Sequence, residues 1–211
     1  MFDYSLVHWT TFLSAALLLN IAPGPDIAFI LGHTVRGGRG QGFAAMFGIW
    51  TGTSGHVLMA ALGLSAVLAT SALAFSVVKW AGAAYLVWLG IRALRSPGGS
   101  FVAQGAPRTR SIATVYRQGI LVSLLNPKVA VFFLAFLPQF VVAGAGPVWA
   151  QLLLHGSLII LVAALIEPPL VVAGAGLVER LRGSPRLGLW LDRALGGLFL
   201  GLGVRLAMTR P

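Results

Sequence analysis

Three ionisable side chains, Asp26, Lys128 and Glu167, interrupt long apolar runs of the sequence. A charged group at the centre of a bilayer costs at least about 2.5 kcal/mol, so in a membrane segment it is expected to bind a ligand, a proton or another charge. Two acids and one base leave one negative charge, which an ammonium group or a proton would match. The residues therefore predict binding and proton exchange at membrane depth, and we assign none of them a catalytic role.

The first acid ends a segment rich in helix breakers, Asn20-Ile21-Ala22-Pro23-Gly24-Pro25-Asp26. Proline removes a backbone donor and disfavours helical geometry in the preceding residue, so one helix should stop near Ala22 and another should begin at Pro25. Free N–H groups at the new helix start would bind a carboxylate, and Asp26 would bind an ammonium or a proton. A kink that serves only packing is the alternative. The substrate-binding candidates here are Asn20, Pro23, Gly24, Pro25 and Asp26.

A second break, Asn126-Pro127-Lys128, lies at the corresponding place in the other half of the chain. Asparagine is a favoured helix N-cap and proline a favoured first helical residue, so a half-helix should begin here and run to Pro138. Lys128 lies in its first turn, where the positive helix end disfavours a cation, so it should bind a carboxylate of the protein or of a substrate. All three residues are substrate-binding candidates. The alternative is a lysine that extends to the membrane surface.

The segment Glu167-Pro168-Pro169 predicts a third interruption, in the fifth apolar run. We expect Asp26 or Glu167 to be the proton-coupling residue, because a carboxylate in a low-dielectric cavity can load and release a proton during a transport cycle. A static pair of Lys128 with either acid, holding helices together, is the alternative. Buried pairs of this kind are poor stabilisers.

The composition of the 211-residue chain is that of a polytopic membrane protein. Hydrophobic residues make up 57%, charged residues only 9%, and the mean hydropathy is +0.88, whereas a soluble domain carries roughly 25% charged residues. The net charge of +10 comes from short arginine clusters between apolar runs, which argues against a nucleic-acid partner. Cysteine is absent, so no disulfide or thiolate metal site is expected. We expect neither a metal nor a cofactor.

Six spans of about 20 or more apolar residues are predicted. They run near 6–31, 42–69, 75–94, 119–142, 148–178 and 187–207. The chain then forms one transmembrane transporter domain, 1–211, with repeat one at about 1–95, a linker at about 96–111 and repeat two at about 112–211. Gly90-Ile91-Arg92 and Gly203-Val204-Arg205 are a weak internal echo. Three spans per half make the repeats inverted, with a midplane site where their breaks meet.

Arginines predict the orientation in the membrane. Connections after odd-numbered spans should be cytoplasmic, with both termini outside, because basic residues concentrate there. These residues are Arg36, Arg39, Arg92, Arg95, Arg108, Arg110, Arg117, Arg180, Arg182, Arg186 and Arg193, against Lys79, Arg205 and Arg210 on the other side. Most tryptophans lie near span starts, as expected for headgroup contacts, but Trp50 and Trp88 do not.

The other conspicuous residues favour structural roles. Gly48, Gly52, His56 and Ala60 share one face of the second span and predict close helix packing. His56 should hydrogen-bond a neighbouring backbone, and the other histidines, His8, His33 and His155, show no metal-ligand spacing. No serine, cysteine or phosphate-loop motif of an enzyme is found.

The two motifs together resemble the LysE/RhtB family of bacterial amino-acid exporters. The matching residues are Asn20 to Asp26, Gly40, Gly42, Gly48, Gly52, Gly119-Ile120, Asn126-Pro127-Lys128, Phe132-Phe133 and Phe136-Leu137-Pro138-Gln139-Phe140. The resemblance implies export of an amino acid or close derivative from the cytoplasm, driven by protons, in the bacterial inner membrane and often as a homodimer.

We therefore expect an all-α integral membrane protein of six transmembrane helices, built as two inverted three-helix repeats in which helices one, four and five are broken. Its partners should be a small-molecule amino acid, protons and the lipid bilayer. A membrane-embedded enzyme or a channel that uses the same carboxylates is the alternative function.

Overall fold

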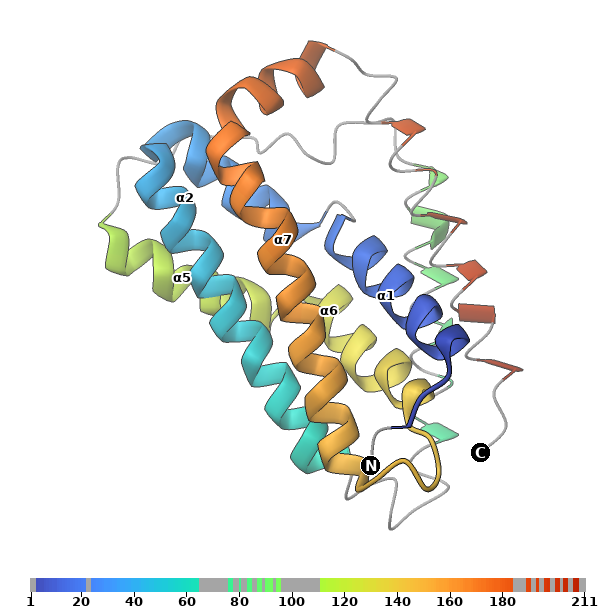
Figure 1. The fold of residues 1–211 in the computed structure, drawn as a ribbon. Helices are drawn as coiled ribbons and strands as arrows, with labels where there is room; N and C mark the ends of the chain where they lie inside the picture. Colours follow the sequence, from blue (N-terminus) through green and yellow to red (C-terminus); the bar gives the residue numbers. More distant parts are fainter. Residues whose placement is uncertain are drawn as a thin grey trace.

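The structure, a computed structural model, describes residues 3–21, 24–64 and 111–183, with separate positions between 76 and 95 and between 189 and 208. Every regular element within these ranges is helical (Figure 1). The predicted linker up to residue 110, about half of the third and of the sixth predicted span, and the site candidate Pro23 lie outside the described residues. The elements are α1 (Leu6–Ile21), α2 (Pro25–Met59), η1 (Ala60–Leu64), α5 (Ile112–Leu124), α6 (Pro127–Val131), η2 (Phe132–Phe136), η3 (Leu137–Phe140) and α7 (Val148–Gly183).

The long helix α2 consists of two arms. Gly38 has φ 76° and ψ 179°, a conformation that glycine adopts without the steric penalty of a side chain. The chain bends there, so that 25–37 follows α1 and 39–59 begins the second predicted span. The bend and the C-terminal end of α7 lie at one end of the molecule, and the loop 141–147 lies at the other (Figure 1).

Within the part of the chain that the structure describes, three segments have the length and composition to cross a membrane, if each bent helix pair counts as one span. Among the described residues, Val148–Gly174 qualifies alone. The pair Leu6–Ile21 with Pro25–Gly63 is bent by 47°, and the pair Ile112–Leu124 with Pro127–Phe140 by 45°. Both bends fall at the predicted proline motifs, and α2 and α6 begin at Pro25 and Pro127, where the sequence predicts helix starts.

The interruption predicted at Glu167-Pro168-Pro169 is wrong, because α7 continues through both prolines. Proline removes backbone hydrogen bonds, but membrane helices tolerate it where packing against neighbouring helices holds the segment. Contacts of α7 with α2 flank the prolines on both sides. A Cβ added at Gly156 would lie 2.8 Å from Val57, and one added at Gly42 would lie 2.9 Å from Val171. The fifth helix is therefore unbroken.

Close packing of α2 on α5 confirms the predicted role of the glycine face. A Cβ at Gly52 would lie 2.6 Å from the carbonyl oxygen of Ile120, and one at Gly119 would lie 2.7 Å from that of Ala45. His56 lies at the same interface, where its Nε2 is 3.1 Å from the carbonyl oxygen of Ser123. Small residues let the two backbones approach, as in many membrane helix pairs. The two helices therefore form a rigid frame beside the second proline motif.

We expect Gly48→Ala to destabilise the protein, since its new methyl group would overlap the carbonyl oxygen of Tyr116. Overpacking of this kind costs roughly 1–3 kcal/mol. Gly40→Ala is the matched control, because nothing lies within 4 Å of a Cβ there, and alanine should stabilise a helix slightly relative to glycine. Thermal unfolding in detergent, followed by size-exclusion chromatography after heating, compares the two. Equal melting temperatures would contradict the close packing.

Candidate functional site

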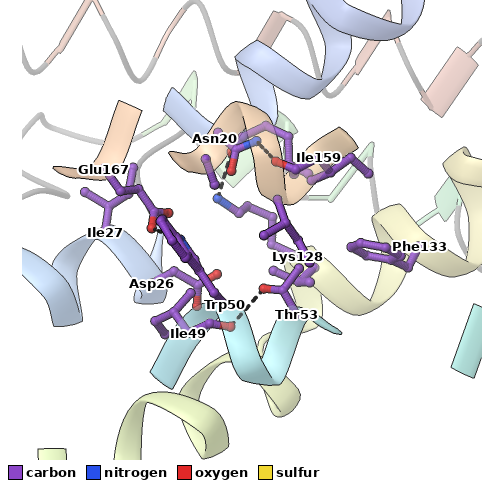
Figure 2. A pocket seen from close by; sticks show the side chains of 14 residues that line it. Asn20, Asp26, Ile27, Ile49, Trp50, Thr53, Lys128, Phe133, Ile159 and Glu167 are labelled. Carbon is purple, nitrogen blue, oxygen red and sulfur yellow. Dashed lines mark hydrogen bonds between the residues drawn. The ribbon is translucent and has the colours of Figure 1, made fainter. Parts of the chain in front are cut away.

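The three ionisable residues singled out in the sequence line one small cavity (Figure 2). Asp26 comes from the start of α2, Lys128 from α6 and Glu167 from the middle of α7, and Asn20 of α1 lines the same space. The cavity measures about 30 Å³, room for about two water molecules. The fold thus brings together residues from both halves of the chain, although the space shown is too small for an amino acid.

Asp26 is positioned by the helix start. Gly24 is extended, Pro25 opens α2, and Asp26 follows in the first turn. Its side chain is only 7% exposed, and its Oδ1 is buried without a hydrogen-bond partner in the described part of the chain. Asn126 Nδ2 is likewise buried without a partner there. Buried polar atoms normally find a partner, so the site has hydrogen-bonding capacity that a ligand could fill.

Lys128 connects α6 to the end of α1. The Asn126 side chain caps α6 by accepting a hydrogen bond from the Lys128 backbone N–H at 3.0 Å. The Lys128 ammonium is buried and donates to the carbonyl oxygen of Leu19 at 3.2 Å. The last carbonyls of a helix lack intrahelical partners and carry partial negative charge, so they attract a cation. The lysine is therefore directed into the protein, and the alternative of a surface-seeking side chain is not what the structure shows.

The first break passes very close to this ammonium. A Cβ added at Gly24 would lie 3.1 Å from Lys128 Nζ, so glycine leaves room for the lysine. Asn20, one turn earlier on α1, donates from Nδ2 to the carbonyls of Ala16 at 2.8 Å and Ile159 at 3.3 Å. These contacts fix the end of α1 against both α6 and α7. The break is thus a junction of three helices around one cation.

Glu167 is held by a residue that the sequence analysis did not assign to the site. Trp50 Nε1 donates to Glu167 Oε2 at 2.6 Å, and Trp50 also lines the cavity. The sequence did hold a signal for Trp50: it lies within an apolar span, away from the span start, so contact with lipid headgroups does not explain it. Thr53 is a second lining residue that was missed, and its hydroxyl lies 3.0 Å from that of Ser123.

A histidine pair away from the cavity was also missed. His8 Nε2 on α1 and His155 Nε2 on α7 lie 2.8 Å apart. Tyr4 stacks on His8 with ring centroids 4.3 Å apart, and Trp9 stacks on His155 at 5.5 Å. The pair joins α1 and α7 within an aromatic cluster. No group of three or more potential metal ligands occurs among the residues that the structure describes.

Comparison with known proteins agrees with this geometry. The family model described as LysE type translocator matches residues 17–210. The chain belongs to this family. Among relatives of the translocator, an uncharacterized membrane protein of Vibrio cholerae is 31% identical over 202 residues, 96% of this chain and 97% of its own. The homoserine/homoserine lactone efflux protein of Salmonella typhimurium is 32% identical over 202 residues, with the same coverage of both chains.

No solved structure matches the translocator. An uncharacterized membrane protein of Pseudomonas aeruginosa is similar over 203 residues at 31% identity, covering 94% of both chains. The family and the names of its relatives identify this chain as a membrane efflux transporter and not as an enzyme. The resemblance stated from the two proline motifs is therefore confirmed.

We expect the cap of α6 in the translocator to contribute to stability. Asn126→Ala removes the acceptor for the Lys128 N–H, and loss of a side-chain cap costs about 1 kcal/mol. Asn126→Ser retains a capping oxygen and should recover most of the loss. Melting temperatures of the two variants in detergent test this expectation. If serine is as destabilising as alanine, the cap is not the cause.

Proposed function

We propose that this translocator exports an amino acid or a close derivative from the cytoplasm by alternating access, in exchange for protons. The observation that carries the proposal is that three buried residues, Asp26, Lys128 and Glu167, line one cavity beside the two proline motifs. Ionisable groups inside membrane proteins commonly mark substrate and proton pathways. A channel would need no such convergence of buried charges.

The charges suit a zwitterion. Lys128 and the N-terminus of α2, whose first turn begins at Pro25, offer positive charge to a substrate carboxylate. Asp26 offers a negative acceptor with unfilled hydrogen-bonding capacity to an ammonium group. Two Salmonella relatives are named for efflux of homoserine and homoserine lactone, so homoserine is the first substrate to test. A cavity of about 30 Å³ must widen to admit it, as alternating access requires.

We also propose the arrangement of two inverted repeats, 1–95 and 112–211, with broken spans one and four. Contacts between described positions of the third and sixth spans support it. A Cβ at Gly90 would lie 2.9 Å from the carbonyl oxygen of Gly196, and one at Gly203 would lie 3.1 Å from that of Ala83. Gly90 and Gly203 are separated by the same number of positions as Ala83 and Gly196. If Gly90 corresponds to Gly203 and Ala83 to Gly196, the second contact joins the same two repeat positions as the first, with each position taken from the other half of the chain.

The decisive experiment is counterflow of labelled homoserine in proteoliposomes, followed by a panel of other amino acids. We expect saturable exchange by the wild type. Lys128→Met should weaken the apparent affinity roughly tenfold to a hundredfold, because a charge-assisted hydrogen bond contributes about 1.5–3 kcal/mol. Arg39→Met, which removes an exposed cation far along α2, is the control. Exchange of no amino acid, or linear and unsaturable flux, would overturn the proposal.

The proposed orientation places the α2 bend in the cytoplasm of a multi-pass inner-membrane protein. The chain has no cysteine, so single cysteines report their own location. Arg39, next to the bend at Gly38, and Ala143, in the loop 141–147, are both exposed. These two segments lie at opposite ends of the molecule (Figure 1). A membrane-impermeant maleimide should label Ala143→Cys in spheroplasts, and Arg39→Cys only after permeabilisation. The reverse pattern would show that the arginine asymmetry was misread.

A further inference from the structure

The two buried carboxylates differ in what already binds them, and this difference separates their roles. We propose that Glu167, held in place by Trp50, is the group that carries the proton, while Asp26 is the group that receives the ammonium of the substrate. The inference rests on the proposed export function and deepens it. It also assigns a positioning role to Trp50, a residue outside both proline motifs.

The bond between Trp50 and Glu167 survives a change in protonation. The indole N–H can only donate, and it donates to Oε2 at 2.6 Å. A carboxylate accepts that hydrogen bond, and so does a carboxylic acid that carries its proton on Oε1. Trp50 therefore keeps Glu167 in one position while a proton arrives and leaves. A residue with this property is suited to carry protons.

Asp26 has the opposite character. Its Oδ1 has no hydrogen-bond partner within the described residues, although the residue is only 7% exposed. An ionised carboxylate is an acceptor only, so the group that completes this site must be a donor, either the nearby Asn126 amide or a ligand. An ammonium group brings three. Asp26 is thus left open for a cation that enters the cavity, whereas one oxygen of Glu167 is already engaged.

The surrounding charges couple the two events. The titratable or charged groups that act on the two acids are Lys128 from α6 and His56 from α2, besides the acids themselves. Both acids line one cavity of about 30 Å³, so an ammonium on Asp26 lies close to Glu167. Its positive charge favours release of the Glu167 proton to the cytoplasmic side, and Glu167 regains a proton from the outside after the substrate has left. In each cycle, one proton is carried from the outside to the cytoplasm as the empty carrier returns, and one substrate molecule is exported.

The alternative is that Trp50 has only a structural role, in which its hydrogen bond to Glu167 joins α2 to α7. The two roles differ in what a variant changes. A structural joint affects every mode of transport alike. A positioning residue for the proton carrier affects transport driven by a pH gradient more than exchange of substrate between two pools at equal pH, because exchange does not require the proton to move.

The test uses the full-length protein in proteoliposomes with labelled homoserine, or with whichever amino acid the wild type exchanges. Counterflow at equal pH is compared with accumulation driven by an acidic vesicle interior. Glu167→Gln should lower accumulation at least about tenfold more than it lowers counterflow, whereas Asp26→Asn should lower counterflow itself through a weaker apparent affinity. Trp149→Phe, at an exposed tryptophan, is the control and should change neither.

Trp50→Phe removes the N–H but keeps an aromatic ring, and it should lower accumulation more than counterflow. Trp50→His restores a ring N–H donor and should recover part of the accumulation. Combined with Glu167→Gln, the Trp50→Phe change should add nothing further, because both act on the same step. Counterflow measured on each variant shows that the protein has folded and inserted.

Three results would overturn the inference while leaving the export function intact. In one, Asp26→Asn is the variant that exchanges without accumulating. In another, Glu167→Gln lowers counterflow and accumulation by the same factor. In the third, Trp50→Phe lowers counterflow and accumulation by the same factor, or the double variant loses more accumulation than Glu167→Gln alone. Absence of counterflow by the wild type with every amino acid would instead overturn the proposed function itself.

Discussion

The hydrogen bond from the buried Lys128 ammonium to the carbonyl of Leu19 is the constraint on which the site depends. A cation this deep in an apolar protein needs acceptors, and an unbroken helix offers none, because its carbonyls are already bonded within the helix. Ending α1 at Ile21 frees carbonyls for the lysine, and the lysine in turn satisfies a carbonyl that would otherwise be orphaned in a membrane. The break in one half of the chain and the charge in the other half thus require each other.

Local chemistry made part of this site predictable. Prolines and an asparagine cap mark where α2 and α6 begin, since these residues act on their own backbone and the next few residues. Contacts that depend on how helices pack were out of reach: Trp50 and Glu167 are 117 positions apart, and His8 and His155 are 147 apart. The same limit explains the error at Pro168 and Pro169, where tertiary packing of α7 against α2 overrides the local preference for a break.

Rigid and adaptable parts of the described structure are distinct. The α2–α5 interface is close-packed through glycines whose neighbours are backbone atoms, which leaves little room for sliding. Around the cavity, by contrast, long side chains such as those of Lys128 and Trp50 make hydrogen bonds to groups on other helices. A cavity of about 30 Å³ must change size to accept an amino acid, and contacts of this kind can be exchanged for contacts to a ligand. The glycine frame is then the fixed support against which the half-helices move.

Stability alone does not account for three buried charges. Replacing a buried ionic group by well-packed apolar residues is often neutral or stabilising, so a fold selected only for stability has little reason to keep Asp26, Lys128 and Glu167 together. The way they are satisfied is also uneven, since Glu167 accepts a short bond from Trp50 while Asp26 Oδ1 accepts none among the described residues. An arrangement that only joined helices would gain by satisfying both acids. Leaving one acceptor open and holding the other in place is what a site needs if it binds a cation and exchanges a proton in separate steps of one cycle.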